Sequence, residues 1–216
     1  MCPQLVAEQE RSCSAMDLST EGGTSGLYFR VESRYKFREH VQGAPVLKTD
    51  EIFLVNPKVE QYVHVAAMPL SMQHDLREVN ASQALRSRFK IVSFSEHDTE
   101  ASKYMNGGDI IRLYHPESDT SLCAGNINKH GKRDVQYIGF YGNDEIEKTS
   151  SMGLWVVEQA EPDQGGPCGY IQMGMPAAYR FRNVATGKYL SAQLPDVNFV
   201  LDEEDLQHAP CHLLLP

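Results

Sequence analysis

The stretch IRLYHPESDTSLCA (Ile111–Ala124) aligns without gaps on a later stretch of the chain, YRFRNVATGKYLSA (Tyr179–Ala192). A third copy, IFLVNPKVEQYVHV (Ile52–Val65), precedes both and aligns on the first of them. Each copy reads as an apolar strand, a polar turn and a second strand, which is the pattern of a β-hairpin. Three such hairpins, each with further strands, predict a β-trefoil, in which a closed barrel removes the edge strands.

The rest of the chain from Gly26 onward also favours a mainly β fold. Short runs of period-2 character recur, such as Phe89–Phe94 and Leu154–Val157, and turn-forming residues bound them. Only Ser71–Leu85 has room for a helical turn or two. Residues 1–25 are polar, rich in Ser, Gly and Glu, and aperiodic, so the sequence predicts a disordered lead-in there.

Composition excludes several classes of protein. The net charge of −9 disfavours a general nucleic-acid binder, which needs a surplus of Lys and Arg. No stretch approaches the roughly 20 apolar residues that span a bilayer. The first residues lack the features of a signal peptide, and five cysteines without a C-x-x-C pair indicate reduced thiols rather than a disulfide framework.

Four motifs in order carry a family resemblance: GGDIIRLYHPESDTSLCA (107–124), GLWVVE (153–158), GGPCGY (165–170) and YRFRNVATGKYLSAQ (179–193). Together they resemble the MIR repeats of the inositol 1,4,5-trisphosphate and ryanodine receptor calcium-release channels. Upstream, LYFRVESRYKFRE (27–39), DEIFLVNPKVEQYVHVAA (50–67) and REVNASQALRSRFKIVSF (77–94) resemble the end of the suppressor domain of those receptors.

The resemblance implies a division of the chain into parts of two adjacent trefoils. Residues 26–104 would be the C-terminal part of a suppressor-like trefoil, and residues 105–216 an incomplete MIR-containing trefoil of the ligand-binding type. The boundary is expected between Tyr104 and Gly108. On this interpretation the chain is a fragment of a much longer channel.

The resemblance also directs attention to one loop. In the family, a basic Arg-Thr-Thr-Gly-Arg loop helps to hold inositol trisphosphate, because arginines form bidentate bonds to phosphates. The equivalent residues here are Gly139–Asn143, so only Gly142 matches, and a family lysine falls on Thr120. The resemblance therefore implies that inositol trisphosphate binding at this loop is weak or lost. A neighbouring basic turn with Lys132 and Arg133 offers an alternative anion site, or is a solvated hairpin tip.

Other candidate sites have simpler interpretations. Thr186-Gly187-Lys188 lacks the remaining residues of a phosphate loop and reads as a hairpin turn whose glycine takes a positive φ. His208, Cys211 and His212 lack a second ligand pair, so no metal site is predicted, and no cofactor is expected. Trp155 is expected in the core, with its indole NH bonded to a local acceptor. No nucleophile elbow or other catalytic signature appears, so we expect no enzyme.

These observations lead to a hypothesis and two alternatives. The family resemblance implies a regulatory, ligand-sensing module of a ligand-gated calcium-release channel, on the cytosolic face of the endoplasmic reticulum membrane. Its expected partners are other domains and subunits of a tetramer, with an inositol phosphate as a weak or lost ligand. One alternative is an MIR accessory domain of a protein O-mannosyltransferase-like or carbohydrate-binding protein. The other is a truncated product with no stable fold.

Overall fold

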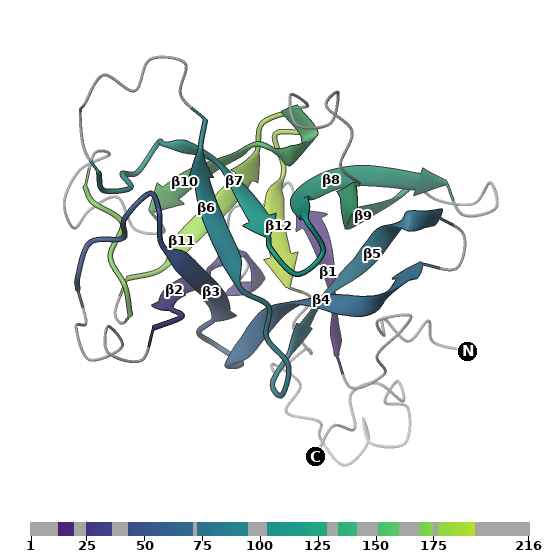
Figure 1. Cartoon of the computed structure of the whole chain (residues 1–216), viewed down its shortest axis with the longest axis horizontal. Helices are drawn as coiled ribbons and strands as arrows, with labels where there is room; N and C mark the ends of the chain where they lie inside the picture. The colour runs from purple at the N-terminus through teal and green to yellow at the C-terminus, as the bar shows by residue number, and fades with distance from the viewer. Residues whose placement is uncertain are drawn as a thin grey trace, which may run out of the picture.

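The computed structural model consists almost entirely of antiparallel β-strands (Figure 1). It describes residues 13–19, 25–35, 43–70, 73–94, 103–128, 134–141, 151–159, 169–174 and 177–192. The strands are β1 (Ser14–Ser19), β2 (Arg30–Ser33), β3 (Glu51–Asn56), β4 (Gln61–Leu70), β5 (Gln73–Ser82), β6 (Phe89–Ser93), β7 (Ile110–His115), β8 (Thr120–Asn128), β9 (Asp134–Tyr141), β10 (Trp155–Gln159), β11 (Tyr179–Asn183) and β12 (Tyr189–Ala192). Two short 3₁₀ turns, η1 (Ser25–Leu27) and η2 (Ser151–Gly153), complete the elements. The prediction of a mainly β fold is confirmed.

Six strands form a closed ring. Strands β2, β3, β6, β7, β10 and β11 pair with one another in that order, always antiparallel. The ring closes where Phe29 and Tyr179 each donate a backbone hydrogen bond of 2.8 Å to the carbonyl oxygen of the other. A closed ring leaves no long unpaired edge to which another chain could add a strand.

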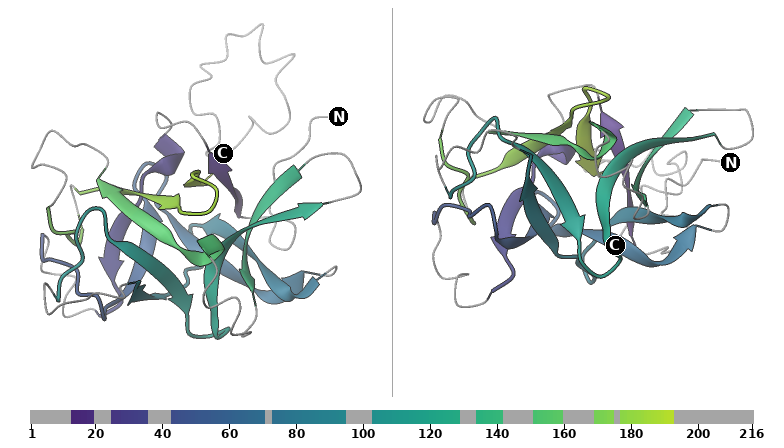
Figure 2. Two further views of the ribbon diagram at one scale, coloured as in Figure 1. Left: turned by 90° about the horizontal axis from the view of Figure 1, so that it is seen from above. Right: turned by 45° about the horizontal axis from the view of Figure 1, so that its top comes forward.

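The remaining six strands form three antiparallel pairs: the hairpins β4–β5 and β8–β9, and the pair β12–β1, which takes the place of a third hairpin although its strands are not consecutive in the chain. Strands β1, β5 and β9 contact one another, and Figure 2 shows β4–β5 and β8–β9 extending on the same side of the ring. A six-stranded ring with three such pairs is consistent with the strand arrangement of a trefoil. From β2 to β11, two consecutive strands of the ring alternate with two consecutive strands of a hairpin.

The pair β12–β1 joins the two ends of the described chain. Met16 lies opposite Ala192 and Leu18 opposite Leu190, and β1 also pairs with β5. The expectation of a disordered lead-in is wrong for residues 14–19, because Met16 and Leu18 alternate inward and are buried in the core. The stretch 71–85, which had room for a helical turn or two, instead contains a strand, β5, whose Val79 and Ala81 alternate inward.

A single hydrophobic cluster fills the structure. It combines Phe29 and Phe89 from the first half of the chain with Trp155 and Phe181 from the second. Trp155 is fully buried, and its Nε1 donates a 2.9 Å hydrogen bond to the Leu122 carbonyl, as expected of a core tryptophan. Across the expected boundary, β6 pairs directly with β7. That boundary therefore does not separate two cores among the described residues.

Candidate functional site

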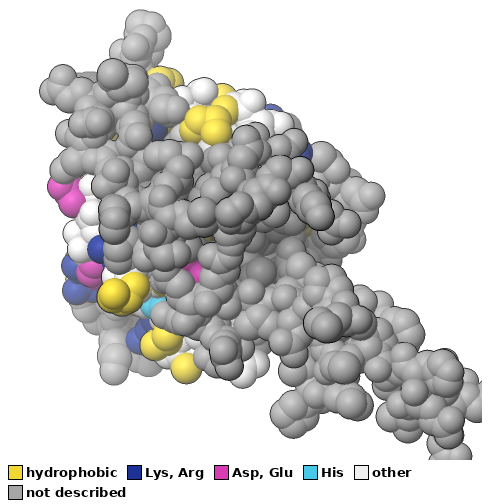
Figure 3. All heavy atoms as spheres, turned by 90° about the vertical axis from the view of Figure 1, so that its right-hand side faces the viewer, with side chains coloured by type: hydrophobic (Ala, Val, Ile, Leu, Met, Phe, Trp, Pro, Cys, Tyr) yellow, Lys and Arg dark blue, Asp and Glu magenta, His cyan; other side chains and the backbone are white. Residues whose placement is uncertain are grey.

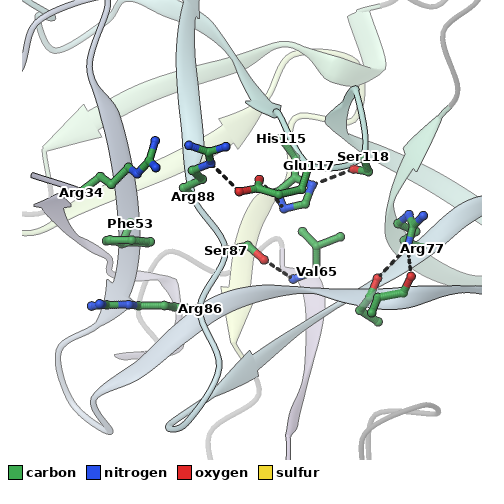
Figure 4. Close-up of a pocket in the computed structure, with 12 residues that line it drawn as sticks. Arg34, Phe53, Val65, Arg77, Arg86, Ser87, Arg88, His115, Glu117 and Ser118 are labelled. Atoms are coloured by element: carbon green, nitrogen blue, oxygen red, sulfur yellow. Dashed lines mark hydrogen bonds and ion pairs between the residues drawn. The ribbon is translucent and has the colours of Figure 1, made fainter.

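A cavity of about 590 Å³ opens beside strand β3, the β4–β5 hairpin, the loop 83–88 and the turn 116–119 (Figure 4). Its described charged side chains are four arginines, a histidine and one glutamate: Arg34, Arg77, Arg86, Arg88, His115 and Glu117. Three of these arginines come from β5 and the loop that follows it, and His115 ends β7. The site is thus assembled where β6 and β7 run side by side. We call this site the arginine pocket.

Two of the four arginines are held in place without a carboxylate. Arg77 donates to the carbonyls of Ala66, at 3.3 Å, and Ala67. The Arg86 guanidinium lies over the ring of Phe53, 4.5 Å from its centroid, in a cation–π contact. In the part of the chain that the structure describes, neither side chain makes an ion pair. Among the described residues, no carboxylate neutralises the charge of either guanidinium.

The other two arginines share two carboxylates. Arg88 pairs with Glu51 at 3.1 Å through Nη1 and with Glu117 through Nε, while Arg34 also pairs with Glu51. Burial alone would raise the pKa of Glu51, but the hydrogen bond from Arg34 and the charge of Arg88 outweigh it and lower that pKa. The two positive charges of Arg34 and Arg88 are thus matched by the two negative charges of Glu51 and Glu117. The surplus positive charge of the pocket resides on Arg77 and Arg86.

His115 lies at the inner side of the pocket with only 6% of its surface exposed. Its Nδ1 is 2.7 Å from the Ser118 hydroxyl, and its Nε2 is 3.3 Å from Oε2 of Glu117. Burial lowers the pKa of His115 below its usual 6.5, despite the opposing effect of Glu117. The ring is therefore mostly neutral at pH 7.

One face of the molecule carries side chains of both charges. In Figure 3, Lys and Arg side chains (blue), acidic side chains (magenta) and a histidine (cyan) lie along one edge of that face. No group of three metal-ligating side chains occurs within the described ranges. No helix there is long and apolar enough to cross a bilayer.

The arrangement suits binding rather than bond-making. Arginine presents several donors in a rigid fork that matches phosphate oxygens, and several such groups around one cavity can hold a ligand with several phosphates. The cavity is also within the range of volumes typical of small-molecule sites. The arginine pocket is thus a candidate site for a compact polyanion.

The pocket differs from the sites predicted from the sequence. Gly142, Lys132 and Arg133 lie outside the described residues, as does the cluster of His208, Cys211 and His212. The turn at Thr186–Lys188 is confirmed, because Gly187 has a φ of 69° and accommodates the tight reversal after β11. The signal for the pocket was the triplet of arginines at 77, 86 and 88, which sequence reasoning used only for the family resemblance.

The two segments of the chain that line the pocket each match a known family model. Residues 103–211 match the family model "MIR domain", and residues 1–100 match the model "Inositol 1,4,5-trisphosphate/ryanodine receptor". A relative from Caenorhabditis elegans, the inositol 1,4,5-trisphosphate receptor itr-1, is 26% identical over 199 residues. That alignment covers 87% of this chain but 7% of the relative.

One solved structure is also similar, a Caenorhabditis elegans structural-genomics protein of unknown function. It is 13% identical with a TM-score of 0.39, and the match covers 84% of this chain and 79% of that one. Within the arginine pocket, the arginines belong to the segment 1–100 and His115, Glu117 and Ser118 to the segment 103–211. Both matched segments are needed to form the pocket.

Proposed function

This chain belongs to the MIR-domain family, and from that membership we propose that it is a ligand-sensing regulatory module that binds a compact polyphosphorylated anion in its arginine pocket. The single observation that carries the proposal is the pair of arginines, Arg77 and Arg86, that line the cavity without a carboxylate partner among the described residues. Arg77 is half-buried and Arg86 is exposed at the mouth of the cavity, and two positive charges beside one cavity attract an anion, which is their natural complement.

The pocket is separate from the loop that the family resemblance pointed to. The Gly139–Asn143 segment lacks both arginines of the family loop, so the proposed ligand does not depend on it. The turn with Lys132 and Arg133 remains a second candidate anion site. We favour the arginine pocket because its basic groups converge on one cavity and are fixed by carbonyl and aromatic contacts.

The wider role of the module follows from its relatives. We propose that it works within a tetrameric calcium-release channel on the cytosolic face of the endoplasmic reticulum membrane, in contact with other domains and subunits. The match to the inositol 1,4,5-trisphosphate/ryanodine receptor model and the Caenorhabditis elegans receptor support this context. In this role the module senses a ligand and performs no chemistry on it.

The test is isothermal titration of the chain with inositol 1,4,5-trisphosphate and with inositol hexakisphosphate. We expect Arg77→Gln and Arg86→Gln each to weaken binding by about 10- to 100-fold, since a hydrogen bond to a charged group contributes about 1.5–3 kcal/mol. Arg182→Gln is the matched control, because Arg182 pairs with Glu158 at 2.7 Å and does not line the pocket. Binding should also weaken as salt is raised.

Three results would contradict the proposal. The first is no heat of binding with either inositol phosphate. The second is binding that the control variant reduces as much as Arg77→Gln does. The third is binding lost only on Lys132→Ala and Arg133→Ala, which would move the anion site to that turn. Methyl mannoside is included in the titrations, because binding of this neutral sugar alone would favour a carbohydrate-binding role instead.

A further inference from the structure

Glu117 differs in charge from the other ionisable residues that line the arginine pocket. It is the one acidic side chain among the described residues that line the cavity. It lies on the turn 116–119 between β7 and β8, and its side chain is 50% exposed. Its Oε1 accepts from Nε of Arg88, and its Oε2 lies 3.3 Å from Nε2 of His115 (Figure 4). The carboxylate therefore occupies two of the groups that a phosphate would use.

Displacing the Glu117 carboxylate from the pocket costs little free energy, because the groups that it contacts have other partners. Arg88 keeps a second carboxylate partner, Glu51, 3.1 Å from its Nη1. His115 keeps its 2.7 Å contact with Ser118. A half-exposed side chain on a turn regains water when it swings outward, so the displaced Glu117 is not left buried and unpaired.

We propose that Glu117 is an internal competitor for the anion site, which a phosphate group of the ligand displaces while His115 takes up one proton from solvent. This inference rests on the proposed function. Its consequence is selectivity: a dianionic phosphate gains more from Arg88 and protonated His115 than the monoanionic carboxylate it replaces. A carboxylate ligand gains nothing by the exchange. Glu117 thereby makes the pocket prefer phosphorylated ligands over carboxylated ones of similar size.

The charges around His115 support the proton uptake. Glu117 faces the ring from its own turn, His64 from β4, Arg77 from β5 and Arg88 from the loop that precedes β6. The Phe89 ring packs against it, with centroids 6.0 Å apart. Burial and the three basic neighbours hold the ring neutral, and Glu117 alone opposes them. A phosphate in place of Glu117 raises the opposing charge, so the pKa of His115 rises on binding.

The sign of the pH dependence follows. The complex holds the proton on His115 more tightly than the free protein does. The affinity for the ligand should therefore rise as the pH falls from 8 towards 6, through the pKa of His115 in the complex. The second ionisation of a phosphate ester lies near pH 6, so the ligand titrates in part of the same range. Proton counting with and without the histidine separates the two contributions.

The experiment compares inositol hexakisphosphate with citrate, a polyanion whose charges are all carboxylates. Isothermal titration at pH 7 in two buffers with different heats of ionisation gives the affinity and the number of protons taken up. We expect Glu117→Gln to tighten citrate binding by about tenfold, because the variant removes a half-exposed negative charge that repels the bound carboxylates, and to narrow the preference for the phosphorylated ligand. His115→Asn should abolish the protein's share of the proton uptake.

Glu158→Gln is the matched control, because Glu158 also pairs with two arginines, at 2.7 and 3.5 Å, but does not line the pocket. We expect it to leave the ratio of the two affinities within about twofold of wild type. If both ligands bind through Arg77 and Arg86 but Glu117→Gln leaves their ratio unchanged, this inference fails while the proposed function stands. A proton count that is the same for wild type and His115→Asn would likewise overturn it. If no variant binds either ligand, both proposals fail.

Discussion

Truncation of one leucine in β1 tests whether the N-terminal strand is part of the fold. Leu18 lies opposite Leu190 in the pair β12–β1 and is 6% exposed. Leu18→Ala removes three carbon atoms from the core, which costs about 2.4 kcal/mol at about 0.8 kcal/mol for each buried methylene-sized group. The cavity left behind adds to this, because β12 and β5 flank β1 and limit its collapse. We expect the free energy of unfolding to fall by about 3 kcal/mol.

Urea denaturation followed by circular dichroism measures the effect. The matched control is Leu85→Ala, because Leu85 lies in the loop 83–88 with 43% of its surface exposed. We expect this control to lose less than about 1 kcal/mol, with the dependence on urea unchanged in both variants. The reasoning is refuted if Leu18→Ala unfolds within about 0.5 kcal/mol of wild type, the range of a neutral surface change, since β1 would then contribute nothing to the folded state.

Two further changes test the core and the buried histidine. Trp155→Phe leaves the buried Leu122 carbonyl without its 2.9 Å indole donor, so we expect a loss of about 1–3 kcal/mol of unfolding free energy, measured by the same urea titration. The folded state holds His115 neutral with a pKa below 6.5, so its contribution to stability is complete above pH 6.5 and is lost as pH falls below that value. Thermal unfolding midpoints from pH 8 to 5 should therefore fall less steeply for His115→Asn than for wild type; equal slopes would contradict the assignment.

The hairpins were predictable because their information is local. An apolar run, a polar turn and a second run follow one another directly in each repeat, so the sequence alone specifies the pairing of β7 with β8 and of β11 with β12. The core position of Trp155 and the positive φ of Gly187 could also be predicted from the residues next to them in the sequence. Repetition of the unit also indicated that strands of the same kind would recur along the chain.

The antiparallel pair of β1 and β12 was not predictable in this way. β1 is six residues long, contains polar residues, and lies in a segment rich in Ser, Gly and Glu. Its partner β12 lies at the opposite end of the described chain, so no short turn in the sequence connects the two strands and indicates that they pair. The two alternating apolar residues Met16 and Leu18 were the available signal, and two positions are too few to identify a strand.

The arginine pocket escaped prediction for a related reason. A search along the chain finds basic residues that are adjacent, such as Lys132 and Arg133, whereas the pocket combines Arg34 and His115 with the arginines of a third segment, 77–88. Which arginines keep a free charge depends on the positions of Glu51 and Glu117 in space. The sequence contains the charges but not their pairing.

The arginine pocket lies at the junction between two segments of the chain. In the β6–β7 ladder Lys90 lies opposite Tyr114, and the side-chain ion pair of Arg88 with Glu117 lies beyond these last paired residues. The ladder joins the two segments that match different family models. If the proposed function holds, a ligand that contacts Arg88, just before β6, and His115, at the end of β7, would stabilise the junction between the segments. By mass action, a ligand at 100 times its Kd adds about 2.7 kcal/mol to the folded state.

Displacement of Glu117 would extend this effect beyond the junction. Glu117 lies on the turn from which β8 begins, so its release acts on the start of that strand. Strand β8 pairs along its length with β9, and β9 in turn contacts β5 and β1. Because β1 pairs with β12, strands β8 and β9 connect the turn that carries Glu117 to the strand pair that joins the two ends of the described chain.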